Sequence, residues 1–140
     1  MFELQVQTEF SAAHAISIAG AVEPTHGHNW RVCVTIASDQ LDGDGLVCDF
    51  HLVQSHLERI VDPMHNRHLN ETPPFDEINP TAEHVAQHIG RSLVRSLATT
   101  LAPGVRVSAV SVTEAPGCAA VFVLPPVDTM TPRPIRQSQQ

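Results

Sequence analysis

The spacing of the apolar residues constrains the fold of this chain more than any other feature, and it changes twice along the sequence. In Phe2–Phe10 and Asn29–Ser38, near the start, apolar residues recur at every second position, as in a strand with one buried face. The same spacing returns in Val105–Glu114 and Ala119–Leu124, which the tight connection Ala115-Pro116-Gly117 joins. We therefore predict one pair of strands at each end of the chain.

Between the two strand pairs, the apolar residues have helical spacing. Asp49 can cap a helix over Phe50–Val61, whose apolar residues fall on one face. A second helix opens in the segment INPTAEHV, with Asn79 or Thr81 as its cap, and ends by Pro103-Gly104. Its stripe consists of Val85, Ile89, Leu93 and Leu97. These faces predict two helices that pack on the sheet.

The order strand, strand, helix, helix, strand, strand predicts a single α+β domain over residues 1–124. The full length of 140 residues is that of one ordinary domain. Residues 125–140 are rich in Pro, Thr, Gln and Arg and lack an apolar period, so we expect them to be disordered. Neither a membrane-spanning run nor a signal peptide is visible, which leads us to expect a cytoplasmic protein.

Charge and composition exclude several classes of function. A formal net charge of −7 argues against a nucleic-acid-binding surface, which would need a basic stripe. All eight basic residues are arginines, so neither a lysine Schiff base nor a P-loop lysine can operate here. Cys33, Cys48 and Cys118 are widely spaced and predict free thiols rather than disulfides or a thiolate zinc site.

Histidine is abundant, with nine residues, and three of them have the spacing of metal ligands. His26 and His28 lead into the second strand, where residues two apart point to the same side. His14 lies just beyond the first strand, and pairing of the two strands would bring it beside the other two. Three imidazoles with a fourth position open to water or substrate is the arrangement of a catalytic zinc site. A His-x-His pair alone is a weak signal, so the flanking sequence matters.

The segments FSAAH, HGHNW, GLVCDF, RHLNE, NPTAE and VTEAPG follow one another along the chain. In order and approximate spacing they resemble the 6-pyruvoyltetrahydropterin synthase and 6-carboxytetrahydropterin synthase family over residues 2–124. The resemblance implies the tunnelling fold (T-fold), an antiparallel sheet with two helices on one face. It also implies that subunits join their sheets into a barrel, as a homo-hexamer built from two trimers, and act on a small dihydropterin substrate.

By this resemblance, His14, His26 and His28 fall on the zinc ligands of the family, and Glu114 falls on the carboxylate that anchors the pterin. A carboxylate suits that role because it accepts the adjacent N–H and NH₂ donors of a pterin edge in a fork. A surface carboxylate at a strand end is the alternative for Glu114. Thr81 resembles a residue near the pterin pocket, yet a helix N-cap explains it equally well.

The chain departs from the family pattern before the histidine pair. Most members carry a catalytic cysteine four residues before the first histidine, and here Val22 occupies that place. Glu23 follows and gives E-x-x-H-G-H, which resembles a variant branch that releases 6-hydroxymethyl-dihydropterin from dihydroneopterin triphosphate. A partly desolvated carboxylate near zinc can act as a general base, so we take Glu23 as a catalytic candidate. The alternative is a loop carboxylate beside Pro24.

A second departure affects the proton relay. Where family members carry an Asp-His pair, this chain has His65 and Asn66. Asn66 cannot titrate but can hydrogen-bond a substrate hydroxyl, and His65 could serve as general acid or base. His68 could contribute too, although a structural role in its loop is as plausible. Arg67 is one candidate for binding a substrate phosphate.

Two hypotheses follow from the sequence. The first is a zinc-dependent carbon–oxygen lyase that acts on the C6 side chain of 7,8-dihydroneopterin triphosphate, with zinc as a Lewis acid and Glu23 and His65 moving protons. The second is a homologue that binds zinc and pterin but has lost turnover. Both require zinc, and product formation separates them.

Overall fold

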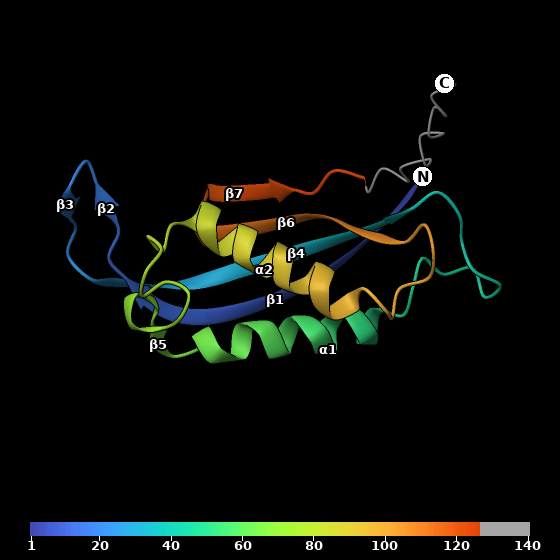
Figure 1. The fold of residues 1–140 in the computed structure, drawn as a ribbon, viewed down its shortest axis with the longest axis horizontal. Coiled ribbons are helices and arrows are strands. Elements are labelled where there is room, and N and C mark those ends of the chain that lie inside the picture. Colours follow the sequence, from blue (N-terminus) through green and yellow to red (C-terminus); the bar gives the residue numbers. More distant parts are fainter. Residues whose placement is uncertain (127–140) are drawn as a thin grey trace, which may run out of the picture.

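A computed structural model describes residues 1–126 of the chain. It contains a five-stranded sheet in the order β5-β1-β4-β6-β7, a separate two-stranded hairpin and two helices that pack against the sheet (Figure 1). The strands and α-helices in chain order are β1 (Phe2–His14), β2 (Ser17–Ile18), β3 (Ala21–Val22), β4 (His26–Ser38), α1 (Phe50–Val61), β5 (Arg67–His68), α2 (Ala82–Leu97), β6 (Arg106–Ala115) and β7 (Cys118–Val123). Two 3₁₀ helices, Asp62–Met64 and Leu69–Glu71, flank β5. The predicted α+β order is confirmed.

The long antiparallel pair β1 and β4 forms the centre of the sheet. Its register runs without interruption from Phe2 opposite Ser38 to His14 opposite His26. Both strands extend further toward the histidines than the apolar alternation predicted. The extra positions carry Ser, Ala, Gly and His, which give no period-two hydrophobic signal although their backbones are fully paired.

One face of the sheet is buried under the helices, and its alternate side chains form the core. Val6 and Phe10 of β1, Trp30 and Val34 of β4, and Val110 of β6 are all buried. The helices cover them with Leu57, Ile89, Leu93 and other apolar side chains. The alternation read from the sequence therefore separates the core face from the open face.

Both helices begin at the capping residues that the sequence offered. The Asp49 carboxylate accepts the His51 N–H at 2.9 Å, and α1 has the predicted bounds. The Thr81 hydroxyl accepts the His84 N–H at 3.1 Å, so Thr81 rather than Asn79 caps α2. The second helix ends at Leu97, earlier than Pro103-Gly104, because the following residues form a turn.

Two asparagines fix the chain where it leaves β1. The Asn70 side chain accepts the Ala15 N–H at 2.9 Å and donates to the Ala15 carbonyl at 2.8 Å. Asn79 makes the same pair of bonds to Ser17, at 2.9 and 2.8 Å. These paired bonds substitute for strand partners and hold the end of β1 against the loops before α2.

The hairpin of β2 and β3 projects from one end of the sheet and returns the chain to β4 (Figure 1). Its turn uses Ala19 and Gly20 with φ of 51° and 81°, the conformation that two-residue hairpins require. No helix within residues 1–126 is long and apolar enough to cross a membrane. Most of the predicted tail, residues 127–140, lies outside the described residues.

Candidate metal centre

Three histidines and one glutamate converge at one end of the sheet. His14 ends β1, His26 and His28 begin β4, and Glu114 lies near the end of β6. One ligand atom from each side chain lies within 4.8 Å of the others. The structure thus brings together the three predicted histidines and also places beside them the residue expected to anchor a pterin.

The hydrogen bonds of two ring nitrogens define which nitrogen of each imidazole faces the centre. His14 Nδ1 lies 2.8 Å from the Pro80 carbonyl, and His26 Nδ1 lies 2.9 Å from the Pro24 carbonyl. A carbonyl only accepts, so both Nδ1 atoms carry hydrogen and both Nε2 atoms are unprotonated in the neutral rings. These two Nε2 atoms nevertheless lie only 3.2 Å apart. A cation between the two nitrogens, either a proton or a metal ion, would relieve the repulsion of two facing lone pairs.

The spacing of the atoms fits a metal ion. Glu114 Oε1 lies 2.9 Å from His14 Nε2 and 3.1 Å from His28 Nε2. Four ligands bound to zinc at about 2.0–2.1 Å in a tetrahedron lie roughly 3.3–3.4 Å from one another. His28 Nε2 is buried and has no hydrogen-bond partner, because its close approach to Glu114 lacks hydrogen-bond geometry. The donor set therefore fits a divalent cation such as zinc.

The surroundings hold His14 in place and disfavour the charged form of His28. The His14 side chain is fully buried, and its ring lies edge-on to Trp30 with the ring centroids 4.8 Å apart. Burial is the main influence that lowers the pKa of His28 below its usual value. A neutral imidazole is the form that binds a metal, and Nδ1–H donation to a carbonyl is the usual way in which a ligand ring is oriented.

Glu23 lies beside the centre without belonging to it. Its Oε1 is 3.7 Å from His26 Nε2 and accepts the Ile16 N–H at 3.1 Å. The Glu23 N–H in turn donates to the Ile16 carbonyl at 3.1 Å, so backbone bonds orient this carboxylate. Val22, which stands at the usual cysteine position, is 68% exposed on the hairpin.

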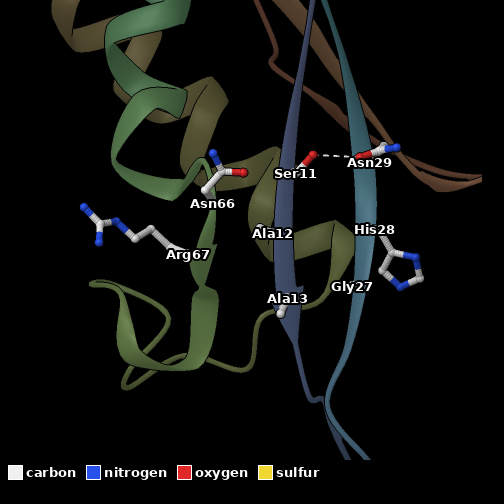
Figure 2. Close-up of a pocket in the computed structure, with 8 residues that line it drawn as sticks. All are labelled: Ser11, Ala12, Ala13, Gly27, His28, Asn29, Asn66 and Arg67. Carbon is white, nitrogen blue, oxygen red and sulfur yellow. Dashed lines mark hydrogen bonds between the residues drawn. The ribbon is translucent and has the colours of Figure 1, made fainter.

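Two hollows flank the metal centre and share the lining residues Gly27, His28 and Asn29. The first has a volume of about 550 Å³ and is lined by the residues labelled in Figure 2. The second has a volume of about 370 Å³ and includes Thr113 and Glu114. The shared residues place both hollows at the end of β4 that carries His28, and only the second hollow includes Glu114 of the cluster.

The predicted relay residues lie apart from the histidine cluster. His65 is exposed, and its Nδ1 accepts the Ser11 N–H at 3.2 Å. Asn66 has a φ of 56° and donates its backbone N–H to the Ser11 carbonyl at 2.7 Å. Figure 2 shows Asn66 and Arg67 on the β5 side of β1, with the Arg67 side chain directed away from His28 on β4.

Two further candidates have structural partners. The Thr81 hydroxyl is used by the helix cap, and Thr81 does not line either hollow. His68 Nε2 lies 3.4 Å from the Thr25 hydroxyl, and its Nδ1 is buried without a hydrogen-bond partner. The carbonyls of Pro24 and Pro80, which orient His26 and His14, could not be predicted from the sequence, because a backbone acceptor leaves no side-chain signature.

Comparison with known proteins identifies one family across the whole domain. The family model for 6-pyruvoyl tetrahydropterin synthase matches residues 3–124. The 6-carboxy-5,6,7,8-tetrahydropterin synthase of Bacillus subtilis (strain 168) is 40% identical over 55 residues, a stretch that spans 38% of this chain and 38% of that relative.

Solved structures show the same fold at low sequence identity. The 6-pyruvoyl tetrahydropterin synthase of Caenorhabditis elegans is 20% identical with a TM-score of 0.74, covering 89% of this chain and 96% of that one. The Plasmodium falciparum enzyme is 18% identical with a TM-score of 0.69, covering 86% and 96%. A Plasmodium vivax enzyme, solved with a catalytic glutamate replaced by alanine, is 20% identical with a TM-score of 0.67 and the same coverage.

Proposed function

The chain belongs to the 6-pyruvoyl tetrahydropterin synthase family, and on this basis we propose that it is a zinc-dependent pterin synthase. Its substrate is 7,8-dihydroneopterin triphosphate, and the reaction takes place on the C6 side chain. The observation that supports this most directly is the convergence of three imidazole nitrogens and a carboxylate oxygen at the end of the sheet, within 4.8 Å of one another. These are the donor atoms that zinc binds in proteins.

The residues of the centre divide the work of binding and proton transfer. His14, His26 and His28 hold the ion, which when bound supplies Lewis-acid polarisation of a side-chain oxygen. Glu114 accepts the donor edge of the pterin ring in a fork. Glu23 takes a proton from the substrate side chain as general base, and its bond from Ile16 holds the carboxylate in place.

The residues on the other side of β1 serve the remainder of the substrate. Because His65 Nδ1 accepts a backbone N–H, Nε2 carries the proton of the neutral ring and is the atom that exchanges protons with the substrate. Asn66 and Arg67 line the same hollow as His28 and are proposed to bind a side-chain hydroxyl and a phosphate.

The glutamate in place of the family cysteine favours side-chain cleavage to 6-hydroxymethyl-dihydropterin. The Plasmodium vivax relative also uses a glutamate as a catalytic residue. In this chain the only carboxylates near the histidine cluster within residues 1–126 are Glu23 and Glu114. With Glu114 assigned to the ring, Glu23 remains as the base.

Product analysis tests the proposal. Zinc-loaded protein is incubated with 7,8-dihydroneopterin triphosphate, and the pterins are separated by chromatography. Glu23→Gln keeps an oxygen that can accept the Ile16 N–H but cannot act as base, so turnover should fall by about 10²-fold or more while zinc stays bound. Glu58→Gln on the exposed face of α1 is the matched control and should retain activity.

A non-catalytic zinc- and pterin-binding homologue is the second candidate. Val22 and Asn66 stand where the family has a thiol and a titratable histidine, and this observation favours the candidate. Pterin binding without product at any zinc loading would support it and reject the enzyme.

We also propose that the subunits assemble as a homo-hexamer through the sheet edges. The edge strand β7 exposes Val121 at 58% and Val123 at 68%, an apolar edge of the kind that pairs with another chain. Light scattering coupled to size exclusion should find six subunits. Val121→Lys should reduce the assembly, whereas Val94→Lys on the exposed face of α2 should not.

A further inference from the structure

We propose that Glu114 alternates between two partners: it is the fourth ligand of the metal ion in the substrate-free protein and leaves the ion for the pterin ring when substrate binds. The inference rests on the proposed function, since it assigns two successive roles to one carboxylate of that site. It also means that the resting centre is closed and that the substrate itself opens it.

The distances identify Glu114 as a ligand. Its Oε1 is 2.9 Å from His14 Nε2 and 3.1 Å from His28 Nε2, close to the edges of a zinc tetrahedron. Glu23, the other carboxylate nearby, is 3.7 Å from His26 Nε2 and does not belong to the group of converging ligand atoms. Of the two carboxylates, only Glu114 contacts two of the three imidazoles.

The two roles of Glu114 exclude each other. A fork to the pterin edge needs both carboxylate oxygens directed at adjacent N–H donors. A carboxylate with Oε1 among three imidazole nitrogens presents only Oε2 to a ring. A four-coordinate ion also has no vacant position for a substrate oxygen, whereas catalytic zinc sites have three protein ligands and one open position.

The backbone makes Glu114 the ligand that can move. The ladder between β4 and β6 ends at Thr113, and the pairing of β6 with β7 shifts register between Thr113 and Ala115, so Glu114 lies in an irregular segment without a ladder partner. His14 and His26 face each other in regular pairing, and carbonyl bonds hold both rings.

A hollow beside Glu114 provides the destination. Thr113, Glu114, Ala115 and Pro116 line it together with His28, so a ring placed there would lie between the carboxylate and a metal ligand. The Glu114 side chain is 26% exposed, while that of His14 is completely buried. A substrate entering from solvent therefore reaches Glu114 before it reaches His14.

Cobalt(II) in place of zinc tests the exchange, because four-coordinate cobalt absorbs visible light more strongly than five- or six-coordinate cobalt. We expect an intense tetrahedral spectrum for the wild-type protein. Glu114→Gln should shift the bands, because water or an amide oxygen replaces the carboxylate, and should bind the metal at least about tenfold more weakly in chelator competition. Glu23→Gln is the matched carboxylate variant and should keep both the spectrum and the affinity.

Neopterin, a pterin without phosphates, then serves as the probe for exchange. Saturating neopterin should change the cobalt spectrum of the wild-type protein. The cobalt spectrum of Glu114→Gln should not show this change. The wild-type titration needs no variant, so it stands even if Glu114→Gln folds poorly by circular dichroism.

Two outcomes overturn the inference. The first is folded Glu114→Gln protein with the cobalt spectrum and metal affinity of the wild type. The second is a wild-type cobalt spectrum that does not change with neopterin, although calorimetry shows that neopterin binds. A wild-type protein that shows the neopterin-dependent change but forms no product from 7,8-dihydroneopterin triphosphate would refute the proposed reaction and leave the ligand exchange standing.

Discussion

At the scale of residues, two prolines determine which way two of the candidate metal-ligating histidines face. The Pro80 carbonyl fixes His14 and the Pro24 carbonyl fixes His26, each through Nδ1. This directs both Nε2 atoms to the same point before any ion is present. Orientation by backbone carbonyls is typical of metal-ligating histidines and limits the ordering that metal binding must impose.

Removing one fixed imidazole should remove the metal. His14→Ala leaves two imidazoles and a carboxylate, so we expect zinc content after dialysis to fall from one equivalent to well below one, measured by atomic emission. His84→Ala is the control, because His84 also bonds a carbonyl through Nδ1, that of Asn79 at 2.7 Å, but lies outside the cluster. Stoichiometric zinc in folded His14→Ala would contradict the assignment of this residue.

The sequence predicted the histidines better than their neighbours. The spacing of His26 and His28 places two rings on one side of a strand from local geometry alone. The contact of Glu114 with His14 depends on the register of β6 against β4, a long-range property that no local pattern encodes. For the same reason, the position of His65 away from the cluster could not be foreseen.

At the scale of elements, prediction succeeded where apolar spacing and capping signals coincide. For α1, Asp49 and the apolar stripe agree, and the bounds match Phe50–Val61. The two-residue strand β5 and the hairpin of β2 and β3 were missed, because each is too short to show a period. Side-chain amides and neighbouring strands stabilise these short pieces, rather than their own sequence.

A substitution of Thr81 distinguishes its role as the N-cap of α2 from a role in the pterin pocket. Thr81→Ala should lower the free energy of unfolding by about 1 kcal/mol, since the His84 N–H loses its acceptor. Urea denaturation measures this change, and Thr81→Ser should restore most of it. Pterin affinity should be unchanged in both variants. A loss of pterin affinity in Thr81→Ala with normal stability would instead place Thr81 in the substrate pocket.

The close approach of α2 to β7 depends on Gly90. A Cβ at this position would lie 2.8 Å from Cδ1 and 3.2 Å from Cε1 of Phe122. Alanine gains about 1 kcal/mol in helix propensity, but overpacking costs about 1–3 kcal/mol, so Gly90→Ala should be neutral to destabilising. In the Phe122→Leu background the clash is relieved, and the same change should become stabilising. Urea denaturation of the wild type, the two single variants and the double variant measures the free energies of unfolding. If the effects of Gly90→Ala and Phe122→Leu on that free energy simply add, the contact between the two residues is contradicted.

At the scale of the whole molecule, partly buried histidines connect stability to pH. Burial first, and Arg95 second, lower the pKa of His88 on α2, whose ring packs edge-on against Phe75. Below the ordinary histidine pKa of about 6.5 the unfolded chain therefore binds more protons than the folded one. The stability contributed by neutral His88 is complete above that value and is lost as the pH falls toward the lowered pKa.

Metal-free protein should accordingly unfold at lower urea concentration at pH 5.5 than at pH 7.5. His88→Gln removes one titrating group and should reduce the difference between the two midpoints. An equal difference in wild type and variant would show that His88 does not contribute. The metal-free form is needed because protonation of the three clustered histidines also competes with metal binding.

The overall architecture followed from the order of the elements, whereas assembly did not. Strand pairs at both ends and helices between them predicted one α+β fold, with a layer of helices on a sheet, which the structure and the family comparison confirm. The joining of sheets into a barrel depends on edges such as β7, whose exposed valines a single-chain pattern cannot assign to a partner.

The position of Trp30 has a practical consequence. It is the only tryptophan in a chain without tyrosine, it is fully buried, and its indole ring lies edge-on to both His14 and His28. Ultraviolet emission from this protein therefore comes from one fluorophore beside two histidines of the candidate metal centre. Ion uptake and imidazole protonation both alter the charge beside that indole, so the molecule contains its own optical reporter of site occupancy.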